Sequence, residues 1–396
     1  MPLAADTIVG VVGAGTMGAG IAQVAALHGH RVVLSDAIPE ALDRARAAIA
    51  SSLARRVDRQ KLSQDAADAA AARIGYVAGI GEAAWAQFAS CGIAIEAVIE
   101  ELSLKKAVLA SLERVMPPDA VLGTNTSSLS VAALGAACKA PGRVVGIHFF
   151  NPAPVMPLVE IVGAITTDAS VVAEAQAFIA GWGKTTVVAS DTPGFIVNRI
   201  ARPFYGEALR IAEEGIADYA TIDWAMRELG GFKMGPFELM DFIGNDVNYA
   251  VTCSVFEAMY YDPRYRPAIT QRRLVEAGML GRKTGRGYYN YHEGAKPPSP
   301  MRDQGLGKRV VDRILAMMIN EAVDALHMQV ASAADIELAM TTGVNYPKGL
   351  LAWGDEIGVR AVLQRITTLQ DEYGDDRYRP SPSLRRMAKE ARRILG

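Results

Sequence analysis

Short apolar runs alternate with helical stretches along the first half of the chain. The apolar runs cover residues 7–12, 31–34, 93–95, 97–99, 121–123 and 144–147. Helical stretches lie between them, such as residues 105–116 and a longer one from about residue 41 to 72. This alternation predicts an α/β domain of the Rossmann type, with a doubly wound parallel sheet whose functional loops follow the carboxyl ends of the strands.

A glycine-rich turn follows the first apolar run. Residues 13–18 read Gly-Ala-Gly-Thr-Met-Gly between the predicted strand and a helix of small residues. In this G-x-G-x-x-G pattern the glycines allow a tight turn, close approach of the backbone to a pyrophosphate and close helix–strand packing. Asp36 lies 23 residues after Gly13, where a carboxylate can accept hydrogen bonds from ribose hydroxyls. No arginine follows Asp36 immediately, so we expect NAD rather than NADP as the cofactor.

Polar clusters follow three of the later predicted strands. Glu100 and Glu101 come after one, residues 124–128 (Thr-Asn-Thr-Ser-Ser) after the next, and His148 ends another. Their position at strand ends predicts a functional site. Residues 124–128 also suit the N-cap of a helix, which hydroxyl and amide side chains favour, and both roles can hold together.

His148 and Glu160 form a candidate catalytic pair. His148 is one of five histidines in the chain and lies in an apolar run, twelve residues before Glu160. Histidine suits proton transfer near neutral pH, and a glutamate at hydrogen-bond distance would orient the ring. The alternative is a structural histidine at a strand end with a surface glutamate nearby. Position alone does not choose between these two interpretations.

The second half of the chain is predicted to be helical, and it contains an internal sequence repeat. A shift of 114 positions places residues 197–200 on 311–314 and Gly235 on Gly349. In the same register, residues 207–208 match 321–322, residues 225–226 match 339–340, Asp241 matches Asp355, and residues 243–244 match 357–358; with one deletion, residues 264–267 match 377–380. So many matches indicate a duplicated helical unit.

The duplication predicts how the helical half is organised. We expect a NAD-binding domain over residues 1–188, a first helical domain over 189–292, a linker over 293–304 and a second helical domain over 305–396. A helical unit with an apolar face often buries it in a two-fold dimer, and a tandem copy can bury it within one chain. We therefore expect a monomer with an internal pseudo-dimer, or a homo-oligomer of such chains.

Composition excludes several classes of protein. Half of the 396 residues are hydrophobic and 21% are charged, which is typical of a soluble globular protein. The net charge of −2 argues against a nucleic-acid partner, and no apolar stretch reaches the ~20 residues that a membrane span needs. The three widely spaced cysteines predict free thiols rather than a metal site. The apolar N-terminus is broken by glycines and has no Lys or Arg before Arg31, so we expect a cytoplasmic protein.

Taken together, these motifs resemble those of the L-3-hydroxyacyl-CoA dehydrogenases over essentially the entire chain. The resemblance rests on residues 13–18, 125–128, 148–160, 192–199 and 235–238. The duplicated tail is most similar to the bacterial 3-hydroxyadipyl-CoA dehydrogenases of phenylacetate degradation. One departure is the connection between the two helical copies, which is shorter here and nearly joins Tyr291 to Met301.

The resemblance implies NAD-dependent oxidation of a (3S)-3-hydroxyacyl-CoA, which is both substrate and partner, to the 3-oxoacyl-CoA. The first candidate substrate is 3-hydroxyadipyl-CoA in aromatic catabolism. The alternative is 3-hydroxybutyryl-CoA in fatty-acid or butanoate metabolism. A non-catalytic relative similar to the lens crystallins is a further alternative. The β-hydroxyacid dehydrogenases are disfavoured, because they use a lysine base where this chain offers His148 and Glu160.

The resemblance also implies roles for individual residues. His148 would take the proton of the substrate hydroxyl, Glu160 would hold and polarise it, and Ser127 and Asn198 would bind the reacting oxygens, with Asn151 in support. The implied cofactor-binding residues are Gly13, Gly15, Thr16, Met17, Gly18, Asp36, Ala97, Glu100, Lys105 and Asn125. Ser52 and Arg59 would meet the CoA portion; Arg59 belongs to a cationic cluster with Arg55, Arg56 and Lys61 that could otherwise be a solvated helix face. The second copy has Asp312 in place of Asn198 and no upstream histidine, so one active site per chain is expected.

Overall fold

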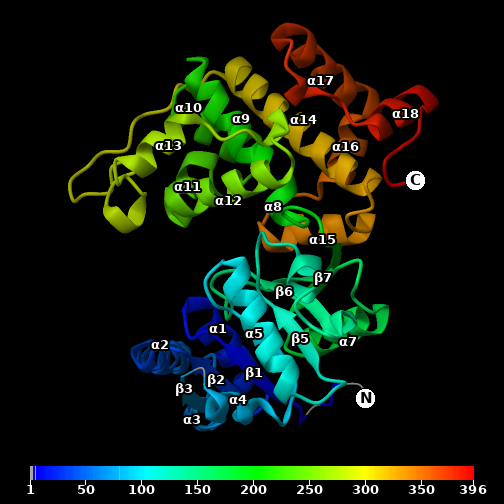
Figure 1. Ribbon diagram of the computed structural model, residues 1–396. Helices are drawn as coiled ribbons and strands as arrows, with labels where there is room; N and C mark the ends of the chain where they lie inside the picture. The colour runs from blue at the N-terminus through cyan, green and yellow to red at the C-terminus, as the bar shows by residue number, and fades with distance from the viewer. Residues whose placement is uncertain (1–2, 5, 80) are drawn as a thin grey trace. The chain divides into compact units, whose positions relative to one another are not determined.

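A computed structural model describes the chain except for residues 1–2, 5 and 80 (Figure 1). The described residues divide into two compact units, Met1–Thr192 and Pro193–Gly396. The division falls a few residues after position 188, since the last strand of the first unit ends at Ser190. Each unit has its own secondary structure and its own buried core.

Within its described residues, the first unit contains one eight-stranded sheet in the spatial order β3-β2-β1-β4-β5-β6-β7-β8. The strands are β1 (Ile8–Val12), β2 (Val32–Asp36), β3 (Ile74–Ala78), β4 (Cys91–Glu96), β5 (Val121–Thr124), β6 (Val144–Phe149), β7 (Leu158–Gly163) and β8 (Thr185–Ser190). Neighbouring strands are parallel except β6 and β7, which are antiparallel. The predicted Rossmann-type sheet is therefore confirmed, with β7 and β8 at one edge running antiparallel to the other six strands.

Three strands carry no clear apolar run and were not predicted. Gly75 interrupts β3, Glu160 lies in the middle of β7, and β8 is a half-buried strand at the edge of the sheet. The separate run at residues 97–99 is not a strand. It follows the end of β4 and belongs to a loop, because the chain turns there toward the next helix.

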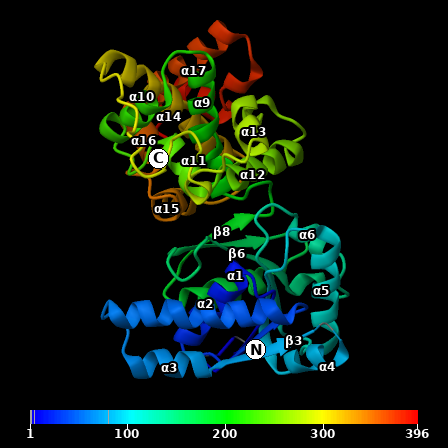
Figure 2. The ribbon, with the colours of Figure 1, turned by 90° about the vertical axis from the view of Figure 1, so that its left-hand side faces the viewer.

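Helices connect the strands of the first unit. They are α1 (Thr16–Leu27), α2 (Pro39–Asp58), α3 (Gln64–Ala72), α4 (Glu82–Trp85), η1 (Ala86–Phe88), α5 (Leu102–Val115), α6 (Val131–Gly135), η2 (Pro141–Arg143) and α7 (Ala169–Ala180). The single helix expected from about residue 41 to 72 is wrong, because the chain breaks it into α2 and α3 (Figure 2). Gln60 has φ of 55°, which a continuous helix does not allow, and the Ser63 side chain caps the start of α3.

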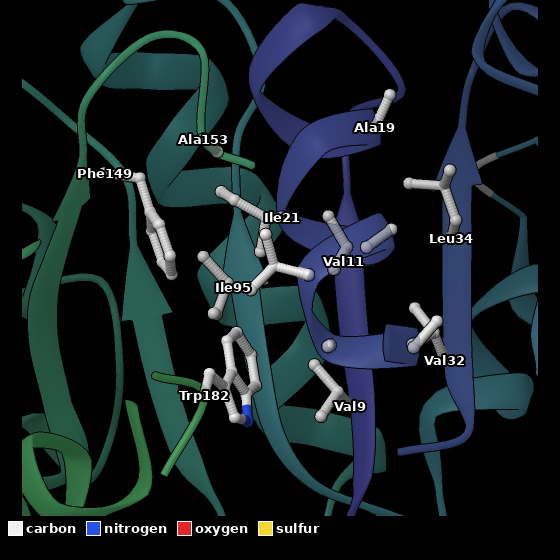
Figure 3. Packing of buried hydrophobic residues seen from close by; sticks show 14 of the residues in the cluster. Val9, Val11, Ala19, Ile21, Val32, Leu34, Ile95, Phe149, Ala153 and Trp182 are labelled. Carbon is white, nitrogen blue, oxygen red and sulfur yellow. The ribbon is translucent and has the colours of Figure 1, made fainter. Parts of the chain in front are cut away.

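The core on one side of the sheet determines which way the candidate histidine points. Val11 of β1, Ile95 of β4 and Phe149 of β6 belong to one buried cluster with residues of α1 and α7 (Figure 3). Trp182, just after α7, stacks on Phe149 with ring centroids 6.2 Å apart. Because side chains alternate along a strand, His148 projects from the opposite face of β6.

The second unit is helical. Its described elements are α8 (Val197–Ile200), α9 (Arg202–Glu213), α10 (Tyr219–Trp224), η3 (Ala225–Leu229), α11 (Pro236–Ile243), α12 (Asn245–Ala258), η4 (Pro263–Tyr265), α13 (Ile269–Glu276), η5 (Arg282–Thr284), α14 (Gln304–His327), α15 (Ala333–Gly343), α16 (Leu350–Ile357), α17 (Val359–Tyr373), η6 (Asp376–Tyr378) and α18 (Pro382–Glu390). The bounds of α11 recur 114 positions later in α16, and α12 and α17 begin 114 positions apart. The tandem helical copies expected from the sequence are therefore present.

Two buried ion pairs, related by the repeat, join the two helical copies to each other. Arg199 Nε donates to Glu321 Oε1 at 2.6 Å, and Arg313 Nε donates to Glu207 Oε2 at 3.0 Å. Arg199 corresponds to Arg313 and Glu207 to Glu321 in the repeat. Each copy therefore supplies the arginine that binds the glutamate of the other.

Two tyrosines repeat the same exchange. Tyr265 donates to Glu321 at 2.6 Å, and its counterpart Tyr378 donates to Glu207 at 3.0 Å. Reciprocal contacts of this kind characterise the interface of a two-fold dimer. The short connection between the copies does not prevent this pseudo-two-fold packing.

Candidate functional site

The glycine turn between β1 and α1 leaves no room for side chains at two positions. Gly13 has φ of +102°, and a Cβ there would lie 2.6 Å from the carbonyl oxygen of Ala97. A Cβ on Gly18 would lie 1.7 Å from the oxygen of Gly13, so α1 packs directly on the turn. A Cβ on Gly15, in contrast, would meet nothing within 4 Å. The backbone at Gly15 is therefore open to a ligand.

The N-terminus of α1 is suited to a pyrophosphate. The helix begins at Thr16, no side chain caps it, and its first turn carries no acidic residue. Its leading N–H groups and the positive end of the helix dipole therefore attract an anion. Thr16 is exposed and Met17 half-buried beside this turn. The residues at the turn fit the phosphate groups of NAD.

Asp36, at the end of β2, is tied to the same turn. Its Oδ2 accepts from Ala14 N at 2.7 Å and its Oδ1 from Ile38 N at 2.9 Å. A carboxylate has about four lone pairs, so two remain for ribose hydroxyls. The structure thus places Asp36 beside the glycine turn, where the sequence predicted it.

A buried ion pair lies at the end of β4. Lys105 Nζ lies 2.8 Å from Glu96 Oε1 and 3.2 Å from Glu100 Oε2, and both Lys105 and Glu96 are almost fully buried. Thr124 donates to the other oxygen of Glu96 at 2.8 Å. Burial raises the pKa of Glu96, and the neighbouring Lys105 offsets only part of this effect. The pair ties α5 to the ends of β4 and β5.

Glu100 organises the polar loop after β5. Its Oε1 accepts from Thr126 Oγ1 at 2.6 Å, from Ser127 N at 2.9 Å and from Ser128 N at 3.1 Å. Burial would raise the pKa of Glu100, but Lys105 and these donors lower it below its usual value. Glu100 therefore positions the loop that carries Ser127, besides lying in the cofactor region that the resemblance implies.

The candidate base and its partner face each other across two strands. His148 of β6 lies directly opposite Glu160 of β7, and His148 Nδ1 is 2.6 Å from Glu160 Oε2. Glu160 is fully buried and His148 is 5% exposed. The antiparallel pairing creates this contact, because residues in register on one face lie close together. The pair expected from the sequence is brought into hydrogen-bond contact.

Asn125 connects the polar loop to the histidine strand. Its backbone N–H donates to the carbonyl of Glu96 at 2.8 Å, and its side-chain oxygen accepts from Phe149 N at 2.9 Å. Phe149 is the residue after His148. Because β1, β4, β5 and β6 are parallel, the glycine turn, the polar loop and His148 lie at the same end of one sheet.

The structure places the other predicted residues on separate elements. Asn151 is exposed in the turn after β6. On α2, Ser52 accepts from Gln23 at 3.0 Å, and Arg59 is exposed at the C-terminal end of the helix. Asn198 is half-buried on α8, in the second unit.

Two acidic residues near the site, Glu96 and Asp191, were not predicted from the sequence. Asp191 accepts from Val131 N at 3.0 Å and Ala132 N at 2.8 Å, so it caps α6 beside the polar loop. An acidic residue that ends an apolar strand was a visible signal for Glu96. Asp191 had none, since its partners lie about sixty residues away.

The family of the chain follows from comparison with known proteins. The family model described as 3-hydroxyacyl-CoA dehydrogenase, NAD binding domain, matches residues 8–192. The model of the C-terminal domain of the same family matches residues 194–291 and 310–393. The chain belongs to the 3-hydroxyacyl-CoA dehydrogenase family of NAD-dependent oxidoreductases.

Individual relatives cover most of this chain. The 3-hydroxyadipyl-CoA dehydrogenase of Escherichia coli K12 is 40% identical over 465 aligned positions, which include 96% of this chain and 97% of the relative. The 3-hydroxybutyryl-CoA dehydrogenase of Bradyrhizobium diazoefficiens is 41% identical and covers 73% of this chain and 96% of its own. A crystal structure of a 3-hydroxybutyryl-CoA dehydrogenase from Escherichia coli K12 has a TM-score of 0.91 at 38% identity, covering 97% of this chain and 98% of that one. None of the helices in the described part of the chain is long and apolar enough to cross a membrane.

Proposed function

We propose that this protein oxidises (3S)-3-hydroxyadipyl-CoA to the 3-oxoacyl-CoA, with NAD as the acceptor. The buried His148–Glu160 pair is the observation that carries the chemistry. Support for the substrate comes from the 3-hydroxyadipyl-CoA dehydrogenase that matches this chain over nearly its full length. The name 3-hydroxybutyryl-CoA dehydrogenase is carried by a relative that matches 73% of the chain and also by a solved structure that matches 97% of it.

In the proposed mechanism His148 acts as the general base. The side chain of Glu160 accepts from Nδ1–H, which fixes the tautomer with its lone pair on Nε2 and stabilises the imidazolium. Nε2 then takes the proton of the substrate 3-hydroxyl. When bound, NAD supplies the acceptor for the hydride that leaves C3.

The remaining candidates bind and orient. Ser127, held by Glu100, and Asn198 donate hydrogen bonds to the oxygen at C3 or to the thioester carbonyl, and Asn151 supports them. The glycine turn and Asp36 hold the cofactor together with Thr16, Met17, Ala97, Lys105 and Asn125. Ser52 and Arg59 bind the CoA portion from α2.

Steady-state kinetics with a panel of substrates test the proposal. NADH formation is followed by absorbance with 3-hydroxyadipyl-, 3-hydroxybutyryl- and longer 3-hydroxyacyl-CoA esters. We expect the highest kcat/KM with the adipyl ester. A clear preference for the butyryl ester would replace the proposed substrate, and turnover of none of the esters would overturn the function itself.

A further inference from the structure

Arg202, the first residue of α9, is a buried cation without a counter-ion in the described part of the chain. It is 6% exposed, its Nη1 donates to Thr252 Oγ1 at 3.1 Å, and its Nε has no partner. The other buried arginines in the described residues each have a carboxylate oxygen within 4.0 Å: Arg143, Arg199, Arg210, Arg264 and Arg313. Burying an unpaired charge is costly, so a site that retains one suits an anionic ligand.

The groups around Arg202 supply neutral acceptors only, the Thr252 hydroxyl and, at 3.5 Å, the backbone carbonyl of Asn248. The guanidinium lies 5.0 Å from the ring centroid of Tyr205, and the nearby Tyr346 has a buried hydroxyl with no partner. Burial lowers the pKa of Arg202, and the two phenols offset only part of this effect. Arg202 Nε and the Tyr346 hydroxyl are therefore two buried donors that no acceptor among the described residues satisfies.

Arg202 also lies at a suitable distance from the expected reacting end of the substrate. It follows Asn198 by four residues, and Ala201 between α8 and α9 keeps a helical backbone. Residues four apart on a helix lie on one side, about 6 Å from each other. In an extended adipyl chain the terminal carboxylate carbon lies roughly 4 Å from C3, given C–C bonds of about 1.5 Å.

We propose that Arg202, assisted by Tyr346, binds the distal carboxylate of a dicarboxyl acyl-CoA and so selects it over a monocarboxyl ester. The inference rests on the proposed function, since it assigns Asn198 to the reacting end. A dicarboxyl substrate needs a cation for its distal carboxylate, and the inference identifies Arg202 as that cation. No sequence pattern distinguishes Arg202 from the other arginines. Arg202 is a specificity residue rather than a catalytic one.

Binding of unreactive esters tests this assignment without turnover. Adipyl-CoA and hexanoyl-CoA have six-carbon chains, lack the 3-hydroxyl and differ in the terminal carboxylate. We expect the wild-type protein to bind adipyl-CoA about 10- to 100-fold more tightly, the range for a charged hydrogen-bonded contact. Arg202→Met should abolish this preference and leave hexanoyl-CoA binding unchanged or improved, and Tyr346→Phe should reduce the preference a few-fold. Equal loss for both esters, or an unchanged preference, would overturn the assignment.

Two controls keep the outcome decisive. If Arg202→Met fails to fold, Arg202→Lys replaces it; the lysine retains the charge but not the planar fork, so the preference should fall to an intermediate value. A full preference in Arg202→Lys counts against the assignment. Selective binding with no turnover of any 3-hydroxyacyl-CoA would overturn the proposed function alone, whereas turnover of the adipyl ester without selective binding would overturn Arg202 alone.

Discussion

Replacement of Glu321 by glutamine should strongly destabilise the helical unit. Glu321 is fully buried, and its two oxygens accept from Arg199 at 2.6 Å, from Tyr265 at 2.6 Å and from Arg264 at 3.0 Å. The substitution keeps the shape but removes the charge that both arginines share. Asp324 remains 3.2 Å from each of them and is partly exposed, so compensation is incomplete.

The expected loss in the free energy of unfolding is about 3 kcal/mol. Breaking a buried ion pair by removing one partner typically costs about 3–5 kcal/mol. The pKa leads to a similar magnitude: burial would raise the pKa of Glu321, but Arg199, Arg264 and Tyr265 lower it from 4.5 to about 2. Over that interval the ionised carboxylate contributes about 3 kcal/mol at neutral pH.

The same pKa predicts the pH dependence of this stability. Since the pKa is lower in the folded state, the contribution is complete above about pH 4.5 and is lost as the pH falls toward 2. The difference in stability between wild type and Glu321→Gln should therefore shrink across this interval. Urea unfolding followed by circular dichroism at several pH values measures it.

Glu207→Gln is the matched control from the other copy. Glu207 accepts from Arg313 at 3.0 Å and from Tyr378 at 3.0 Å, and Arg313 also binds Glu214 at 2.7 Å. Its shortest contacts, at 3.0 Å, are longer than the two contacts of Glu321 at 2.6 Å, so the loss should be smaller. A loss below ~1 kcal/mol for Glu321→Gln, or a larger one for Glu207→Gln, would refute the reasoning.

Three other predictions concern the site and the repeat. His148→Gln should lower turnover by at least ~100-fold and leave NAD binding intact, because it removes the general base. Stopped-flow kinetics measures the turnover, and fluorescence titration with NADH measures the binding. Near-normal turnover would exclude His148 as the general base. Gly13→Ala should weaken NAD binding at least ~10-fold, because its Cβ would meet the Ala97 carbonyl at 2.6 Å in a left-handed conformation; unchanged affinity in the same titration would contradict this. Deletion of residues 305–396 should expose the apolar face of the first copy and cause dimerisation or aggregation, as analytical ultracentrifugation would detect. A soluble, active monomer would argue against the pseudo-dimer.

The cofactor half of the site could be predicted from the sequence, because its residues are close together along the chain. The glycine turn and Asp36 depend on backbone conformation and on a fixed spacing, so their pattern is visible in one dimension. The repeat of 114 positions was visible for the same reason, since it is a comparison of the chain with itself. Strand β7 was not visible, because Glu160 interrupts its apolar pattern.

The residue pattern alone predicts the Rossmann-type domain, the glycine turn, the duplicated helical half and the two members of the His148–Glu160 pair. The three-dimensional fold makes β6 and β7 antiparallel, and this pairing brings the two side chains to 2.6 Å. The fold also decides which buried charges are compensated: Arg199 meets Glu321, while Arg202, three residues later, meets no carboxylate among the described residues. The physical reason is that charge compensation depends on neighbours more than a hundred positions away, which the local pattern of residues does not encode.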